Sequence, residues 1–344
     1  MLNRPDPFDP GQLFAGFEHF SGLLIAVSGG PDSLALMRLA RSWRDAGAKP
    51  ALHAATVDHG LRLDSAAEAD QVGRWARALG LPHEILVWRG EKPQTGVQEK
   101  AREARYALLF EQARAVGADA VATAHHADDQ WETILIRLAR GSGIAGLSGM
   151  ARDQGFTDGR LVRPLLGLRK AELIDYCRRE GQDFFIDPAN SNPVFARARW
   201  RALAPALRDL GLTPERLEKF GARARKADEA LDSAARDLMA RAKKPESDDY
   251  DLRLAQSIPV AVFERFLALA IEERAGAAPA RLERLELFTQ KLQLAYNNRA
   301  PFHGTLGGCA ASLSAEGFLS LRREPRRRRG AAGQRRDFPD LSSD

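Results

Sequence analysis

The feature that most constrains this chain is a glycine loop, Ser28-Gly29-Gly30-Pro31-Asp32-Ser33, set between two apolar runs. The run Leu23–Val27 before the loop is typical of a buried strand, and the run Leu34–Ala40 after it is typical of a helix. Adjacent glycines let the backbone approach a ligand closely, and the free N–H groups that begin a helix attract a phosphate-like anion. The sequence therefore predicts a strand–loop–helix unit that binds a nucleotide.

The residue types in the loop indicate which kind of nucleotide site it forms. A Walker loop carries Gly-Lys-Ser/Thr, whose lysine reaches the terminal phosphates, and this loop has no lysine. With Asp32 and Ser33 at the helix start, the loop is typical of a site that holds a pyrophosphate leaving as one unit. An ordinary turn, in which Ser28 or Asp32 only caps the helix, stays open as the alternative.

Strand-like and helix-like runs alternate through the first half of the chain. The strand-like runs are Leu23–Val27, Pro50–Val57, His83–Val87 and Ala118–Ala124. The helix-like runs between them are Leu34–Ala46, Ser65–Leu79 and Gln98–Val116. This alternation predicts an α/β fold with a doubly wound parallel sheet. Ligands of such sheets bind at the carboxyl ends of the strands, where the polar motifs of this chain lie.

The second half of the chain differs in pattern. Helical spacing runs through Arg216–Ala242, Val260–Arg274 and Pro279–Tyr296, and the glycine-spaced segment Leu306–Leu321 predicts a small β-hairpin. We therefore expect a first domain over residues 1–211, a smaller and mainly helical domain with a small β-hairpin over residues 212–324, and an arginine-rich, disordered tail over residues 325–344.

The net charge and the cysteine content limit the classes of function that fit this chain. The formal net charge is +5, and eight arginines lie between Arg322 and Arg336 against the single acid Glu324. Such a run either binds nucleic acid or is a solvated tail. The only cysteines, Cys177 and Cys309, form neither a disulfide framework nor a Cys-x-x-Cys pair. With no apolar run near the roughly 20 residues of a membrane span and no secretory signal, we expect a cytoplasmic enzyme without membrane partners.

The densest cluster of polar residues lies within Thr123–Thr133, directly after a predicted strand. Its members are His125, His126, Asp128, Asp129 and Glu132. Placing so many ionisable groups together is costly unless they bind something. Adjacent histidines cannot share a helix face, which disfavours zinc, whereas carboxylates combined with substrate phosphates favour Mg²⁺. Helix capping by the aspartates explains some of these residues but not their concentration.

Several weaker motifs have two interpretations each. Backbone groups of Val57 can contact adenine beside Asp58-His59-Gly60-Leu61-Arg62, or that segment is a plain turn. Arg105 can point at phosphates, whereas Arg102 fits a solvated helix face. The glycine-rich segment Arg140–Met150 fits a lid or a linker. The arginines Arg197, Arg199 and Arg201 fit contacts to phosphates or RNA, or a basic helix face.

Taken in order, these segments resemble the tRNA(Ile)-lysidine synthetase family of PP-loop ATP pyrophosphatases. Residues 23 to about 205 carry the resemblance, and the segment from Leu306 to Glu324 is similar to the first carboxy-terminal domain of the family. The matching motifs are Ser28–Ser33, Val57–Arg62, Ala101–Tyr106, His125–Thr133, Arg140–Gly143 with Gly146-Leu147, Arg163–Leu166 and Asp187–Asn192.

The resemblance implies a reaction in two steps. ATP adenylates the carbonyl oxygen at carbon 2 of the wobble cytidine in a tRNA(Ile) with a CAU anticodon, and pyrophosphate leaves. Free L-lysine then attacks that carbon and expels AMP. The sequence leaves the oligomeric state open, with a homodimer as one possibility.

The resemblance also implies roles for individual residues. Ser28, Gly29, Gly30, Pro31, Asp32 and Ser33 hold the phosphates, and Asp32 and Asp129 bind Mg²⁺. Glu132 orients or deprotonates the lysine amine. His125, Arg105 and Arg197 contact ATP or stabilise the adenylate. The family often has Arg-Asn where this chain reads Arg197-Ala198.

Three other classes of function share parts of this pattern. A PP-loop tRNA thiolase adenylates a base but needs paired cysteines or an iron–sulfur cluster. A PP-loop synthetase that forms an amide on a small molecule gives no reason for the arginine-rich tail. A protein that only binds RNA has no need of the acidic cluster.

Overall fold

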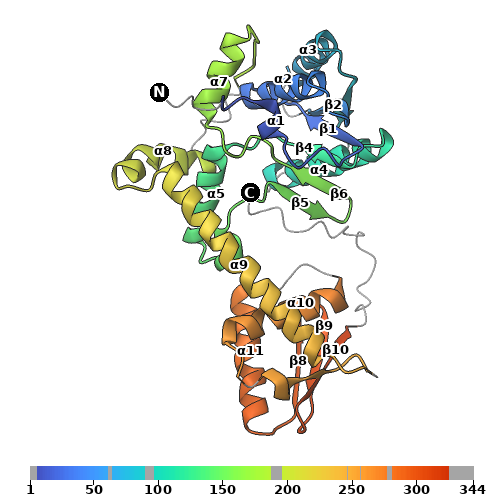
Figure 1. Ribbon diagram of the computed structural model, residues 1–344, viewed down its shortest axis with the longest axis vertical. Coiled ribbons are helices and arrows are strands. Elements are labelled where there is room, and N and C mark those ends of the chain that lie inside the picture. The colour runs from blue at the N-terminus through green and yellow to red at the C-terminus, as the bar shows by residue number, and fades with distance from the viewer. Residues whose placement is uncertain are drawn as a thin grey trace. The chain divides into compact units, whose positions relative to one another are not determined.

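The computed structural model describes residues 6–60, 64–89, 97–186, 196–245, 247–255, 257–276 and 281–324, without the side chains of residues 97, 98 and 196–198. Contacts divide the chain into two compact units (Figure 1). One unit runs to Ile136 and resumes from Gly149 to Lys219. The other contains Arg137–Ser148 and the chain from Phe220 onward. Each unit has its own buried apolar core.

A six-stranded sheet forms the centre of the first unit, in the order β3-β2-β1-β4-β6-β5. The strands are β1 (Gly22–Ala26), β2 (Ala51–Asp58), β3 (His83–Val87), β4 (Ala120–Ala122), β5 (Asp153–Phe156) and β6 (Gly159–Val162). All neighbours are parallel except β5 and β6. The predicted α/β fold with a mainly parallel sheet is confirmed. The antiparallel edge hairpin was not expected, because β5 carries no apolar run that marks it as a strand.

Helices cover both faces of this sheet. The helices of this unit are α1 (Pro10–Leu13), α2 (Pro31–Asp45), α3 (Ser65–Ala78), α4 (Val97–Ala115), α5 (Ala127–Ala139), α7 (Lys170–Arg179) and α8 (Ala196–Asp209). Helices α2, α3 and α4 pack directly on the strands, whereas α5 and α8 share a separate apolar cluster. Leu23 and Ile25 of β1 pack in one core with α2, α3 and α7. Leu24 is buried outside that core, and α4 contacts β1, β2 and β4. Successive strand residues face opposite sides, so α4 covers the other face.

The order of the strands indicates where on the sheet a ligand can bind. Strand β1 has β2 on one side and β4 on the other, so the chain changes direction across the sheet between β1 and β4. Ligands of open α/β sheets bind at this switch point, beyond the carboxyl ends of the strands. The glycine loop follows β1 and the histidine–aspartate cluster follows β4. The two motifs that the sequence singled out therefore meet at one edge of the sheet.

The second unit combines helices with a four-stranded antiparallel sheet in the order β7-β10-β9-β8. Its strands are β7 (Tyr250–Asp251), β8 (Phe302–Leu306), β9 (Cys309–Leu313) and β10 (Phe318–Arg323). Its helices are α6 (Ile144–Leu147), α9 (Pro214–Ala242, which begins in the first unit), α10 (Val260–Ala275), α11 (Leu282–Asn297) and the 3₁₀ turn η2 (Leu252–Ala255). The predicted hairpin is thus part of a larger sheet. Within the described residues, no helix has the length and apolar character to cross a membrane.

The glycine loop generates a stability prediction. Gly29 has φ +83°, and a Cβ added there would lie 2.7 Å from Cδ2 of Phe185. We expect Gly29→Ala to lower the free energy of unfolding by about 1–3 kcal/mol, because of the left-handed backbone and this clash. At Gly30, with φ −76°, an added Cβ would lie 3.8 Å from Ser28 Oγ. Gly30→Ala should therefore stay within about 1 kcal/mol of the wild type in urea unfolding. Equal effects of the two substitutions would contradict this assignment.

Candidate functional site

The glycine loop is fastened by its own serines. The backbone N–H of Ser28 donates to Ser33 Oγ at 3.1 Å, and that hydroxyl donates to the Gly30 carbonyl at 3.0 Å. From outside the loop, the N–H of Phe185 donates to the Gly29 carbonyl at 2.9 Å. These bonds hold the loop in one shape, as a preorganised binding site requires.

The loop leads into an uncapped helix start. Helix α2 begins at Pro31, which has no N–H, and its N-cap residue Gly30 offers no side-chain acceptor. The N–H groups of Asp32 and Ser33 lie in the first turn, where a helix supplies no carbonyl partner of its own. Together with the helix dipole they favour an anion directly in front of the loop.

The carboxylate of Asp32 lies between two cationic side chains. Its Oδ2 is 3.1 Å from Lys170 Nζ and 3.6 Å from His126 Nε2. Burial by itself raises the pKa of Asp32, but His126 and Lys170 outweigh burial and hold that pKa below its ordinary value. The other oxygen, Oδ1, is buried without a hydrogen-bond partner among the described residues. It is therefore a carboxylate oxygen ready to accept a further cation or donor.

His126 joins the two loops. Its side chain is almost fully buried, and its Nε2 is 3.4 Å from Asp129 Oδ2 as well as 3.6 Å from Asp32 Oδ2. Burial by itself lowers the pKa of His126, but the carboxylates of Asp129 and Asp32 raise it above the ordinary value of 6.5. The imidazole therefore lies between one aspartate from α2 and one from α5, and both carboxylates favour its protonated form.

Sequence reasoning gave a role to the neighbouring His125 and none to His126. His125 is half-buried, and its Nδ1 forms a hydrogen bond of 2.8 Å with Thr123 Oγ1. Strand β4 before them is buried on both faces, so no polar–apolar alternation shows which histidine points inward.

A second ion pair links helix α8 to the acidic cluster. Arg201 donates to both oxygens of Glu132, Nε to Oε1 at 2.5 Å and Nη2 to Oε2 at 3.2 Å. Its Nη2 also lies 3.8 Å from Asp129 Oδ1. About two turns further along α8, Arg208 Nη2 is 3.3 Å from Asp128 Oδ1. Glu132 is only 2 % exposed, so its charge depends on the guanidinium beside it.

The remaining predicted residues are less closely tied to this cluster. Val57 lies half-buried near the end of β2, and Arg105 lies on α4 with an exposed side chain. The side chain of Arg197 and the segments 61–62, 187–192 and 325–344 lie outside the described residues. The glycine-rich segment contains the short helix α6, where Arg137 Nη1 donates to the Gly146 carbonyl at 3.0 Å.

The carboxylates fit a magnesium ion that is shared with a nucleotide. Among the described residues, no group of three or more histidines, cysteines or carboxylates has the geometry of a complete metal site. Mg²⁺ does not need one, since it is usually held by one or two carboxylates, substrate phosphates and water. Asp32 and Asp129 approach the same imidazole nitrogen, and Asp32 Oδ1 is unpartnered. This donor set fits the ion.

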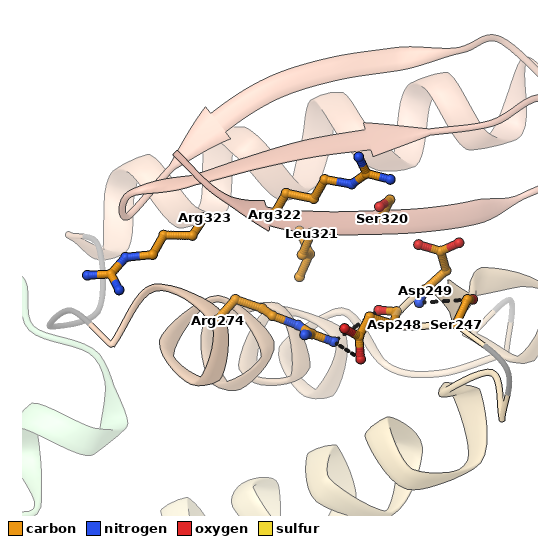
Figure 2. A pocket seen from close by; sticks show the side chains of 8 residues that line it. All are labelled: Ser247, Asp248, Asp249, Arg274, Ser320, Leu321, Arg322 and Arg323. Atoms are coloured by element: carbon orange, nitrogen blue, oxygen red, sulfur yellow. Dashed lines mark hydrogen bonds and ion pairs between the residues drawn. The ribbon is translucent and has the colours of Figure 1, made fainter. Parts of the chain in front are cut away.

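A pocket of about 480 Å³ lies in the second unit (Figure 2). Its lining residues are Ser247, Asp248, Asp249, Arg274, Ser320, Leu321, Arg322 and Arg323. Arg274 Nη2 is paired with Asp248 Oδ1 at 2.7 Å, whereas Arg322 and Arg323 are exposed and extend in different directions from the end of β10. The pocket contains no residue of the glycine loop or acidic cluster, so it is a separate feature with an arginine-rich rim.

Comparisons with known proteins agree with this geometry. A family model described as a PP-loop domain matches residues 10–207. A tRNA(Ile)-lysidine synthase of Methylobacterium nodulans is 48% identical over 318 residues, 90% of this chain and 92% of the relative. One from Methylobacterium sp. strain 4-46 is 46% identical and covers 97% of this chain and 100% of the relative.

A solved structure shares the fold. The U34-tRNA thiolase of Methanococcus maripaludis superimposes with a TM-score of 0.53 at 14% identity, over 63% of this chain and 76% of that one. At this identity the likeness concerns the fold alone. The identities to the synthases and the PP-loop match over residues 10–207 place this chain in the tRNA(Ile)-lysidine synthase family.

Proposed function

We propose that the protein ligates L-lysine to carbon 2 of the wobble cytidine in a tRNA(Ile) with a CAU anticodon, converting ATP to AMP and pyrophosphate. The observation that carries the proposal is the meeting of Asp32 from the PP-loop and Asp129 from the acidic cluster at one nitrogen of His126. This geometry occurs in a chain that is 46–48% identical to proteins named tRNA(Ile)-lysidine synthase.

In the first step, the carbonyl oxygen of the base bonds to the α-phosphorus of ATP while the bond from that phosphorus to the bridging oxygen of pyrophosphate breaks. Backbone N–H groups of the Ser28–Ser33 loop that have no partner within it, among them those of Asp32 and Ser33 at the start of α2, are proposed to hold the β- and γ-phosphates, and Val57 and His125 are proposed to contact the nucleoside. Asp32 and Asp129 would hold Mg²⁺, which would supply positive charge to offset that of the leaving pyrophosphate.

In the second step, a lysine amine bonds to carbon 2 and the bond from that carbon to the adenylated oxygen breaks, so AMP leaves with this oxygen. The amine must lose a proton, and Glu132 is the proposed acceptor. Both oxygens of Glu132 accept from Arg201 in the free protein, so the amine would approach this carboxylate beside that guanidinium. Arg105 and Arg197 are proposed to stabilise the adenylate.

The thiolase alternative is disfavoured by the state of Cys177. This residue is fully buried, its thiol donates to the Pro31 carbonyl at 3.3 Å, and burial raises its pKa to about 11. Sulfur transfer uses a thiolate, which this side chain does not form near neutral pH. Cys177 instead stabilises the PP-loop through its hydrogen bond to the Pro31 carbonyl.

The first test is ligation itself. We expect purified protein with ATP and Mg²⁺ to incorporate radiolabelled lysine into a CAU-anticodon tRNA(Ile) transcript, and not into the same transcript with a GAU anticodon. Pyrophosphate release that requires a different acceptor, without lysine incorporation, would refute the proposed function.

The second test removes the paired carboxylates. Asp32→Asn and Asp129→Asn should each reduce ligation at least about 100-fold, because the leaving pyrophosphate loses its counter-charge. Asp175→Asn on α7 is the control, since that carboxylate is 67% exposed in a surface ion pair with Arg178. Ligation rates and melting temperatures are measured together, and a folded Asp32→Asn or Asp129→Asn variant with wild-type rates would rule out the metal assignment.

The third test concerns tRNA binding by the second unit, which we propose to act through the rim of its pocket. Replacing both Arg322 and Arg323 by alanine should weaken tRNA binding and reduce the slope of log K against log salt by about 1–2. The double variant Arg236→Ala, Arg241→Ala removes the same charge from ion-paired positions on α9. If both double variants change the slope equally, net charge and not this rim accounts for the effect.

A further inference from the structure

Lys170 is a basic residue that the PP-loop itself does not supply. It begins helix α7, lies 138 positions from Asp32 in the sequence, and brings its Nζ to 3.1 Å from Asp32 Oδ2. Its backbone N–H donates to Asp128 Oδ2 at 2.8 Å. The backbone of Lys170 is thus fixed against the acidic cluster while its side chain reaches the phosphate loop.

The chemistry of the loop calls for a mobile cation at this place. A pyrophosphate leaving group carries several negative charges, and Walker loops meet such charge with a lysine of their own. In the described part of the chain, the cations paired with Asp32 are His126 and Lys170. The His126 side chain is 3% exposed and held between carboxylates, whereas that of Lys170 is 40% exposed on a flexible stem. Lys170 is therefore the one of this pair that can change partner.

The ion pair between Lys170 and Asp32 is easily exchanged for a stronger one. A partly exposed lysine–carboxylate pair is weak, whereas a phosphate offers several charged acceptor oxygens. A cation that binds the Asp32 carboxylate also competes with the ammonium for the same group. Nucleotide and metal arriving together would therefore release Lys170 from Asp32 and offer it a stronger partner.

We propose that Lys170 is a phosphate-binding residue whose ammonium rests on Asp32 in the free protein and transfers to the β- and γ-phosphates when ATP binds. It then stays with the pyrophosphate as that group leaves. The proposal rests on ATP being cleaved at this loop, as the proposed function requires, but does not depend on lysine being the nucleophile.

The test compares two ligands of the same site. In Lys170→Met, calorimetric titration with magnesium pyrophosphate should show at least about tenfold weaker binding, while AMP binding stays within about twofold of the wild type. Arg178→Met on the same helix is the control, since Arg178 is 69% exposed and pairs only weakly with Asp175 at 3.4 Å. Unchanged pyrophosphate binding by folded Lys170→Met, or an equal loss of AMP binding, would overturn the proposal.

A second measurement uses the wild-type protein and so does not depend on the variant folding. Brief acetylation followed by peptide mass spectrometry should show Lys170 protected by magnesium pyrophosphate and not by AMP. Equal labelling with and without pyrophosphate would also overturn the proposal. If pyrophosphate protects Lys170 but no lysine enters tRNA, the phosphate role stands and the proposed ligation fails.

Discussion

The buried side chain of His126 between Asp32 and Asp129 is the interaction on which the site depends. It joins the loop after β1 to the helix after β4, and with Lys170 beside Asp32 and Arg201 beside Asp129 it offsets the cost of burying two carboxylates. The Asp32 contribution to stability is present above its unfolded pKa of 3.8 and is lost as the pH falls through its lowered folded value. The His126 contribution is present below its unfolded pKa of 6.5 and is lost as the pH rises through its raised folded value. The stabilising contributions of Asp32 and His126 are therefore both fully present only between pH 3.8 and pH 6.5.

In the free protein, the charged side chains of the candidate site are paired with one another. Asp32 is paired with Lys170 and His126, Glu132 with Arg201, and Asp128 with Arg208. In the proposed function, Mg²⁺ and phosphates take over the pairing of Asp32 and Lys170, and the lysine amine takes over the pairing of Glu132. Binding therefore exchanges one set of ion pairs for another and avoids leaving bare charges in a partly buried site. The sheet provides the frame for this exchange, because its switch point brings α2, α5 and α7 to one edge.

Local features of this fold could be predicted from the sequence, and distant pairings could not. The strands β1 to β3 and the helices α2, α3 and α9 follow from apolar periodicity, and the PP-loop follows from its glycines. The edge strand β5 and the two-residue strand β7 carry no such pattern and form through pairing with neighbours. Lys170 meets Asp32 across 138 residues, and Arg201 meets Glu132 across 69. Sequence spacing along α8 does not tell which of its arginines faces α5, so these partners emerge only from the tertiary structure.

In the proposed reaction, the PP-loop directs AMP onto the oxygen of the base before lysine attacks. The most direct measurement uses a CAU-anticodon tRNA(Ile) whose wobble cytidine carries ¹⁸O at carbon 2, with mass spectrometry of the AMP released during ligation. We expect the AMP to contain the ¹⁸O atom, because the adenylated oxygen leaves with it. AMP without the label, or AMP that instead takes oxygen from the carboxylate of labelled lysine, would contradict the account.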